Sequence, residues 1–380
     1  MSKWNEFRLD ELCSFISRGI TPQYVDYGIP VVNQKCIRDN KVDLSLCRFT
    51  DTFQKIKEEK HIRYGDILIN STGTGTLGRV AIYRHNAEKI SADGHVSILH
   101  AKKDINSIYL GYFLHSVEPL IENLGRGSTN QIELAAKDLK RIKIILPDLN
   151  TQNKIADILS TYDELIENNN KRIATLEQMA ENLYKEWFVR FRFPGYETSE
   201  FKNGIPVGWE IKKVGKDNLL PIITGKKDAN YGDDGGKYTF FTCAQKAIMA
   251  PNYSFDQSAI ILAGNGDLSV KLFKGKFEAY QRVYVLTPYN LDYLNILYYV
   301  IKDELKTLTQ GASGSTIRFI TKGMIERIST LIPNEAILKQ FNEIIDDIYE
   351  QKTLLEKANN NLIKQRDLLL PRLMSDKLEV

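Results

Sequence analysis

A long internal repeat constrains this chain more than any other feature. The segment GRGSTNQIELAAKDLKRIKIILPDLNTQNKIADIL begins at Gly125, and the related segment GASGSTIRFITKGMIERISTLIPNEAILKQFNEII begins at Gly311. Pro147 aligns with Pro333, 186 positions later. Solenoid units recur every 20–50 residues, so this much longer period indicates a duplicated domain, each copy of which is followed by a similar tail.

The two tails have the heptad spacing of coiled-coil helices. Apolar residues recur at steps of three and four through 151–187, where Gly and Pro are absent, and the second tail follows the same pattern as far as Pro371. At ~1.5 Å per residue, the first tail would form a rod of roughly 55 Å. We expect the helices to pair antiparallel about an internal pseudo-two-fold axis. The alternative is that each helix folds onto its own domain.

Apolar stripes identify the residues expected to pair the helices. They are Leu159, Tyr162, Ile166, Asn169, Leu176 and Leu183 in the first helix, and Ile348, Leu355, Leu362 and Leu369 in the second. A polar residue at a core heptad position, such as Asn169, fixes register at some cost in stability. The other line of the second helix is half polar and consists of Ile345, Lys352, Asn359, Arg366 and Leu373.

The repeat also predicts the domain organisation. Residues 1–150 and 209–335 mix strand-like runs, such as Asp66–Asn70, with Gly-rich loops and helical stretches. Residues 151–190 and 336–380 are the two expected spacer helices, and 191–208 is a linker containing Gly and Pro. The predicted fold class is therefore α+β. Two duplicated mixed α/β domains are separated and joined by two long helices in an antiparallel coiled coil.

Composition excludes several classes of protein. The four cysteines form no C-x-x-C pair and are expected to be reduced cytosolic thiols. There is no apolar signal core at the N-terminus and no run of ~18 apolar residues, so we expect a cytoplasmic protein. The net charge is only +3, so a DNA-binding surface would have to come from local clusters of Lys and Arg.

The sequence lacks the constellations of a catalytic site. The GTGTLG segment at Gly73–Gly78 resembles a dinucleotide-binding loop, but the strand-like RVAIYRH follows it where a helix is required. We find no phosphate-binding P-loop, no amino-methyltransferase tetrapeptide, no nucleophile elbow and no zinc-protease motif. All five histidines lie in the first copy, so the two copies share no catalytic His. We expect no catalysis and no metal site.

Loops rich in Gly, Ser, Thr, Asn and basic residues recur in both copies. Their backbone amides suit phosphates, and Arg, Lys, Asn and Gln side chains suit base edges; the alternative is ordinary turns with solvated charges. The candidate DNA-binding residues are Lys35, Ser71, Thr72, Thr74, Arg79, Arg126, Ser128, Asn130 and Gln131 in the first copy, and Lys226, Lys227, Asn265, Lys271, Ser315, Thr316 and Arg318 in the second.

Taken together, these features resemble the DNA-specificity subunits of type I restriction–modification systems. The resemblance rests on the starts KWNEFRLDEL and IPVGWEIKKV, the Gly-Ser/Thr turns, the strands ending IILP and TLIP, and the helix that follows Gln152. It covers essentially the whole chain, and its specificity comes from the two-fold arrangement.

The resemblance implies that each mixed domain recognises one short half-site of an asymmetric, bipartite DNA target. It also implies that the helices act as a spacer and as the dock for two modification (methyltransferase) subunits, which restriction/translocase subunits can join. S-adenosylmethionine, ATP and Mg would bind those partner subunits, and none would bind this chain.

Three other functions stay open on sequence. The chain could be the specificity subunit of a type II-like enzyme in which methylase and nuclease are fused. Only the neighbouring genes would distinguish this from a type I system. It could be a coiled-coil scaffold with no role on DNA, or an enzyme whose site is hidden. DNA affinity that falls steeply with salt would favour a DNA reader over a scaffold.

Overall fold

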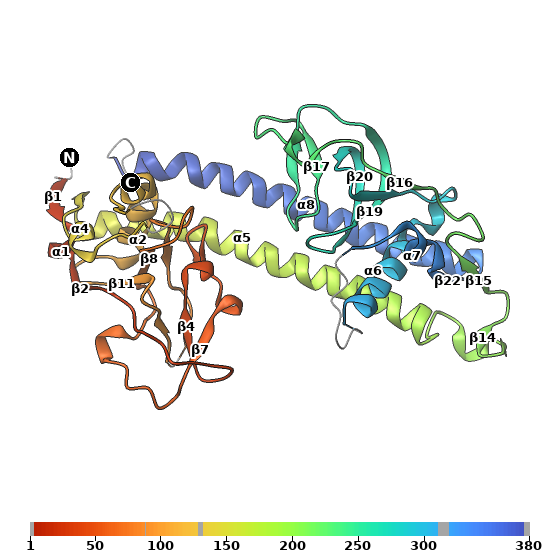
Figure 1. The fold of residues 1–380 in the computed structure, drawn as a ribbon, viewed down its shortest axis with the longest axis horizontal. Helices are drawn as coiled ribbons and strands as arrows, with labels where there is room; N and C mark the ends of the chain where they lie inside the picture. The colour runs from red at the N-terminus through yellow and green to blue at the C-terminus, as the bar shows by residue number, and fades with distance from the viewer. Residues whose placement is uncertain (1–3, 88, 128–131, 311–318, 376–380) are drawn as a thin grey trace. The chain divides into compact units, whose positions relative to one another are not determined.

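The computed structural model describes residues 4–87, 89–127, 132–310 and 319–375 (Figure 1). The chain divides into two compact units. The first comprises Met1–Asn169 and Lys357–Val380, and the second comprises Asn170–Glu356. Each unit therefore contains one mixed domain together with part of each long helix.

The first mixed domain is built around a four-stranded antiparallel sheet. Its order is β2-β11-β8-β9, and its strands are β2 (Cys13–Arg18), β11 (Val96–Ala101), β8 (Ile67–Asn70) and β9 (Val80–Ile82). Helix α2 (Ser107–Ser116) packs on this sheet, where buried Tyr109 and Leu110 join Ile67 and Val80 in one core. Burial of such β-branched and aromatic side chains drives this domain to fold.

Shorter elements complete the first domain. A second sheet has the order β10-β4-β7-β3, with β10 (Ser91–Ala92), β4 (Ile29–Val32), β7 (Arg48–Thr50) and β3 (Tyr24–Val25). The remaining strands are the pairs β1 (Asn5–Arg8) with β12 (Lys143–Leu146) and β5 (Ile37–Arg38) with β6 (Lys41–Val42). The short α-helices are α1 (Leu9–Leu12), α3 (Glu118–Asn123) and α4 (Ala136–Leu139).

The second mixed domain repeats the same sheet. Its strands β16 (Ile222–Thr224), β21 (Val283–Leu286), β19 (Phe255–Ala263) and β20 (Val270–Ala279) take the order β16-β21-β19-β20, again with antiparallel neighbours. The sheet continues into β17 (Tyr238–Phe241) and β18 (Ile248–Ala250). Helix α6 (Leu294–Gln310) packs on this sheet, and α7 (Lys322–Arg327) precedes the last strand.

Matching hydrogen bonds show that the two domains are copies. Leu9 N–H donates to Ile142 O at 2.9 Å, and Val214 N–H donates to Ile328 O at 3.0 Å. Ile328 lies 186 positions after Ile142, the period of the sequence repeat. The following strands also pair alike, β1 with β12 and β15 (Glu210–Lys213) with β22 (Ser329–Ile332). The linker contributes the small hairpin of β13 (Phe201–Lys202) and β14 (Ile205–Pro206).

Both predicted long helices are present. Helix α5 spans Leu149–Tyr184 and passes into a π-helical turn at Lys185–Val189. Helix α8 spans Glu335–Leu373. The heptad pattern read from the sequence stops at Pro371, but the helix itself continues two residues further. Leu370 and Leu373 are buried in the core of the first domain, and this packing holds the last turn despite the proline.

The helices run antiparallel within each unit. In the first unit, Arg366 Nη1 lies 2.6 Å from Asp163 Oδ1, and Asn169 Nδ2 donates to Asn359 Oδ1 at 2.8 Å. In the second unit, Lys352 Nζ lies 2.5 Å from Glu177 Oε1. Residues progressively later in α5 therefore contact residues progressively earlier in α8. The predicted fold of two mixed domains with antiparallel helices is thus confirmed, and each polar residue on the half-polar line of α8 has a polar partner.

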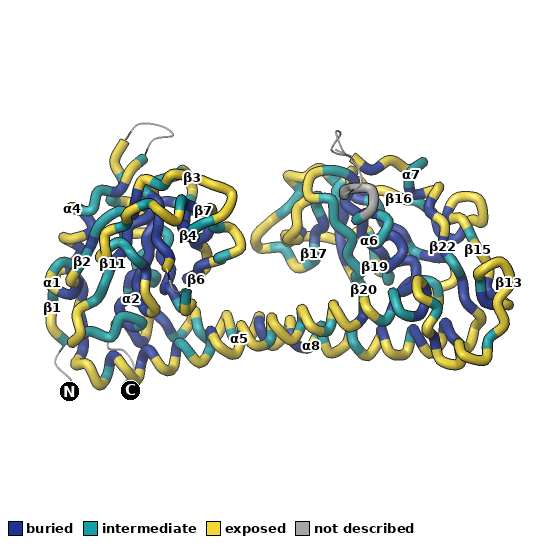
Figure 2. Tube along the Cα trace, turned by 90° about the horizontal axis from the view of Figure 1, so that it is seen from below, coloured by how far each residue is buried: buried dark blue, intermediate teal, exposed yellow. Residues whose placement is uncertain are grey.

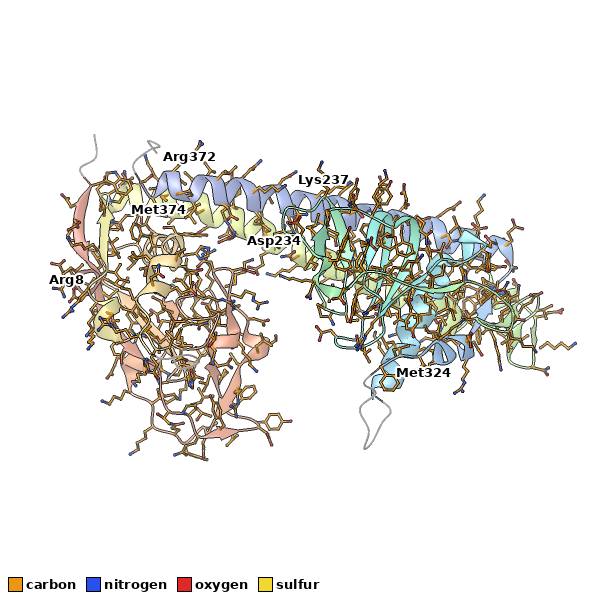
Figure 3. All side chains as sticks on the ribbon, turned by 45° about the horizontal axis from the view of Figure 1, so that its top comes forward. Arg8, Asp234, Lys237, Met324, Arg372 and Met374 are labelled. Carbon is orange, nitrogen blue, oxygen red and sulfur yellow. The ribbon has the colours of Figure 1, made fainter. Side chains whose placement is uncertain are left out.

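The predicted apolar pairing residues are all at least partly shielded from solvent. Leu159, Ile166 and Leu355 are buried, and the other predicted apolar residues are partly buried (Figure 2). Phe341 is fully buried where α8 begins, and its ring centroid lies 4.7 Å from that of Phe188. In the first unit, buried Met374 follows the end of α8 and joins the same core as Leu159 (Figure 3).

Candidate nucleic-acid interface

Three predicted loop segments come together in the first domain. Leu134 N–H donates to Ser71 O at 2.9 Å, and Thr72 forms a β-bridge with Glu133. The Asn70 side chain donates to Gln34 O at 3.1 Å, which places the turn carrying Lys35 beside them. We call this set the first loop cluster, and it consists of Asn33–Cys36, Ser71–Arg79, Asp93–His95, Arg126–Gly127 and 132–134.

The second domain forms the same arrangement. Ile320 N–H donates to Gly264 O at 2.7 Å, and Asn265 forms a β-bridge with Phe319. Phe319 and Ile320 lie 186 positions after Glu133 and Leu134. The second loop cluster consists of Thr224–Lys227, Gly264–Asp267, Tyr280–Arg282 and Phe319–Ile320. Duplication has therefore preserved the backbone frame of both clusters, including its hydrogen bonds.

A further loop contributes to both clusters, and sequence reasoning missed it as a site. Ser71 N–H donates to His95 O at 2.8 Å, and Gly264 N–H donates to Arg282 O at 2.9 Å. His95 and Arg282 thus occupy equivalent places, although neither is among the DNA-binding residues predicted from the sequence. A signal was available in the sequence, because ADGHVSIL from Ala92 and AYQRVYVL from Ala279 align at a spacing of 187.

The predicted DNA-binding residues differ in how accessible they are. Lys35, Thr74 and Lys226 are exposed, and Thr72, Lys227 and Asn265 are partly exposed. Ser71 is fully buried, and its hydroxyl lies 2.6 Å from that of Ser97. The Ser71 hydroxyl therefore faces the protein interior. Ser128, Asn130, Gln131, Ser315, Thr316 and Arg318 lie outside the described residues.

Three predicted basic residues already have protein partners. Arg79 donates from Nη2 to Gly75 O at 2.7 Å and so braces its own loop. Arg126 Nη2 lies 3.2 Å from Asp138 Oδ1, although most of the Arg126 side chain is exposed. Lys271 donates to Ala244 O at 2.9 Å, and burial lowers the pKa of its ammonium group. These three side chains would have to give up or share these interactions to bind DNA.

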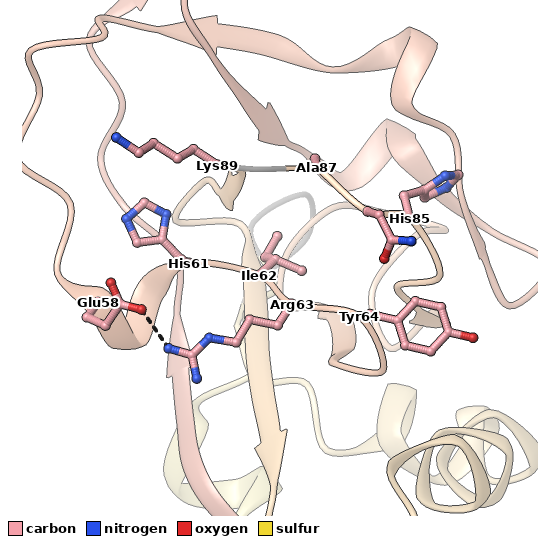
Figure 4. Close-up of a pocket in the computed structure, with 9 residues that line it drawn as sticks. Glu58, His61, Ile62, Arg63, Tyr64, His85, Ala87 and Lys89 are labelled. Carbon is pink, nitrogen blue, oxygen red and sulfur yellow. Dashed lines mark hydrogen bonds and ion pairs between the residues drawn. The ribbon is translucent and has the colours of Figure 1, made fainter.

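The first domain also contains a cavity that lies outside its loop cluster. It has a volume of 480 Å³ in the first domain and is lined by residues that include His61, Arg63, His85 and Lys89 (Figure 4). The Arg63 guanidinium is paired with Glu58 at 2.7 Å, and both side chains are largely exposed. An exposed pair of this kind contributes little to stability, and the cavity shares no residue with the clusters.

Each mixed domain is joined to the helices by a carboxylate of α5. Asp163 is buried and accepts a hydrogen bond from the Tyr112 hydroxyl of α2 at 2.5 Å. In the second unit, Glu181 receives hydrogen bonds from Lys185 and from Lys306 of α6, and it also pairs with Lys302. Burial alone would raise the pKa of Glu181, but these lysines outweigh it and lower that pKa to about 2.

Two features of other protein classes are absent from residues 4–87, 89–127, 132–310 and 319–375. Those ranges contain no group of three or more His, Cys, Asp or Glu residues arranged to hold a metal ion. None of their helices combines the length and apolar content that a membrane span requires.

Comparison with known proteins identifies the family. Residues 1–178 and 206–365 match the type I restriction modification DNA specificity domain. The chain belongs to this family and is the DNA-specificity subunit of a type I restriction–modification system, which is a non-catalytic component. The resemblance inferred from the sequence is therefore confirmed.

Individual relatives agree with this assignment. The chain is 36% identical over 178 residues to the type I restriction enzyme EcoDI specificity subunit of Escherichia coli, a match that covers 46% of this chain and 39% of that protein. It is 27% identical to the putative MjaX specificity subunit of Methanocaldococcus jannaschii over 99% of this chain and 94% of that protein. Its fold is similar to a crystal structure of the S subunit from M. genitalium (TM-score 0.60, 16% identity), with 98% of this chain and 96% of that chain covered.

Proposed function

We propose that each mixed domain reads one half of a bipartite, asymmetric DNA site through its loop cluster. The observation that supports this is one shared backbone frame carrying different side chains. Thr72, His95 and Glu133 in the first cluster stand where Asn265, Arg282 and Phe319 stand in the second. Base edges are distinguished by side chains, so two equal frames with unequal side chains suit two different half-sites.

The proposal gives each predicted segment of the chain a role. Residues 1–150 and 209–335 act as target-recognition domains, and 191–208 is the linker between the two halves. The helices of 151–190 and 336–380 act as a spacer that sets the gap between the half-sites. Helix α5 has 36 residues, which corresponds to a length of roughly 54 Å at ~1.5 Å per residue.

The partners would be double-stranded DNA, two modification subunits docked on the helices, and restriction/translocase subunits. The chain would bind no cofactor of its own, and S-adenosylmethionine, ATP and Mg would be held by the partner subunits. Such a complex would act on DNA in the cytoplasm. Loops that contact phosphates through Lys35 and Lys226 would make binding depend strongly on salt.

A selection from random duplex DNA tests the proposal. The chain is assembled with its modification subunits, and bound DNA is recovered at several salt concentrations and sequenced. We expect a split motif of two unlike halves around a fixed gap, with affinity falling steeply as salt rises. Recovery of DNA with no common motif would contradict the proposal and would favour the scaffold function.

A further inference from the structure

A cavity opens within the second loop cluster. Its volume is 440 Å³, and its lining residues are Thr224, Gly264, Asn265, Gln281, Arg282, Tyr284, Phe319 and Ile320. Sites for small ligands have volumes of about 300–1,000 Å³. Every lining segment belongs to the proposed DNA-reading surface or to strand β21 directly beneath it.

The walls of this cavity are held by hydrogen bonds and close packing, and its lining combines polar and aromatic side chains. Gly264 forms part of the wall, and a Cβ at this position would lie 2.5 Å from Arg282 O, so a larger residue does not fit. The Tyr284 hydroxyl donates to Ile320 O at 3.1 Å and holds the far side. Phe319 is 60% exposed, so it presents an aromatic face at the opening.

The side chains suited to hydrogen bonding are free for a ligand. Gln281 and Arg282 are exposed, and within the described residues their side chains make no hydrogen bond or ion pair. The backbone beneath them is held by the bonds from Gly264 N–H to Arg282 O and from Gln281 N–H to Lys227 O. An arginine donor on a rigid loop end matches a planar group that presents two acceptors.

The first domain has filled the equivalent space. Gly19 N–H donates to Val96 O and Gly225 N–H donates to Val283 O, so the preceding residues, Arg18 and Thr224, are equivalent. Arg18 projects from the end of β2, and its Nη2 donates both to Glu133 Oε2 and to Leu134 O at 3.1 Å. Glu133 and Leu134 are the counterparts of Phe319 and Ile320. Thr224 is too short to make such contacts, and the cavity stays open.

We propose that the side chains at the opening of this cavity read the major-groove edge of one guanine in the half-site of the second domain, and that Arg18 closes the corresponding opening in the first domain. In the major groove, guanine presents two acceptors, O6 and N7, and arginine is their commonest bidentate partner. Arg282 is the donor to that edge, Gln281 supports it from the same loop, and Phe319 contacts the neighbouring base. This assignment rests on the proposed DNA-reading function.

Filling the cavity is the most direct test. In the complete complex with modification subunits, Thr224→Arg copies the residue of the first domain, and Lys216→Arg, which places an arginine on an exposed turn outside the cluster, is its control. Arg282→Ala removes the donor, while Lys216→Ala removes one positive charge from an exposed turn elsewhere in the same domain. Affinity is measured for the wild-type site and for sites with each base pair of the second half-site replaced.

We expect Thr224→Arg and Arg282→Ala to weaken binding roughly ten- to hundredfold, as removal of one bidentate hydrogen-bonded pair does, whereas both controls leave it unchanged. Arg282→Ala should also abolish discrimination at one G·C pair of the second half-site and leave the first half-site intact. Two results would overturn the assignment. One is unchanged affinity and sequence specificity in both variants, and the other is a loss of discrimination at a base pair other than G·C. A wild-type complex with no preferred sequence would instead reject the proposed function. Thermal unfolding of each variant distinguishes a weakened interaction with DNA from misfolding.

Discussion

The guanidinium of Arg366 in α8 lies 2.6 Å from Oδ1 of Asp163 in α5, and both side chains are largely buried. The other oxygen of Asp163 accepts the Tyr112 hydroxyl and lies 3.5 Å from Arg84. One carboxylate therefore joins the first mixed domain to both long helices. Burial lowers the pKa of Arg366, but the interaction with Asp163 more than offsets this and the pKa is raised.

Removing the positive partner should destabilise the first unit strongly. Arg366→Met keeps the volume of the side chain but leaves the Asp163 carboxylate without its main counter-ion. Breaking a buried pair in this way costs about 3–5 kcal/mol, whereas Tyr112→Phe should cost only about 1–2 kcal/mol. Urea unfolding gives both values. Changes under about 0.5 kcal/mol for both variants, as ordinary surface substitutions give, would mean that Asp163 does not hold these elements together.

The hydrogen bond between Asn169 and Asn359 should set helix register more than stability. Replacing both residues with Leu gives an apolar layer, which is expected to raise Tm while permitting shifted pairings. Register is measured by cross-linking cysteines placed at Glu177 and Lys352, whose side chains contact each other across the helices, and, separately, at pairs one heptad out of register. The wild-type Asn pair should give only the first cross-link. If the Leu variant also gives only the first cross-link, Asn169 and Asn359 do not set the register of the helices.

Glu181 should make stability depend on acid pH. Its pKa of about 2 lies below the ordinary value of 4.5, so the folded state favours the carboxylate. The stabilisation is complete above pH 4.5 and is lost as pH falls toward 2. We expect Glu181→Gln to lower the free energy of unfolding by roughly 1–3 kcal/mol near pH 7, with the difference vanishing near pH 2. The exposed Glu164→Gln serves as the control, and a pH-independent difference would contradict the assignment.

Charge reversal at the exposed lysines of the loop clusters should weaken binding to all DNA sequences about equally. Lys35→Glu and Lys226→Glu alter the two loop clusters separately, and Lys216→Glu is the control. Each cluster variant should reduce the slope of log affinity against log salt by about one for every phosphate that the protein no longer neutralises. Binding curves at a series of salt concentrations supply the slopes. Equal slopes for all three variants would place the phosphate-binding residues elsewhere.

Much of this architecture is predictable from the sequence, because repeats and periodic stripes survive divergence. The helices, the strand in DILIN and the strand after GTGTLG follow from local pattern. The polar partners of Lys352 and Arg366 do not, since they depend on the antiparallel register of two segments far apart in the chain. The equivalence of Arg18 with Thr224 could not be predicted from the sequence either. The domains differ in length between these strands, so no single spacing aligns all loops.

The central claim, that the two mixed domains read unlike half-sites, is tested most directly by a base-resolution map of adenine methylation in host cells. The map compares cells with the gene, without it, and with Arg282→Ala. The account predicts a split motif that disappears on deletion and whose second half alone relaxes in the variant. A methylation pattern that is unchanged by deletion of the gene in a host with active modification subunits would contradict it.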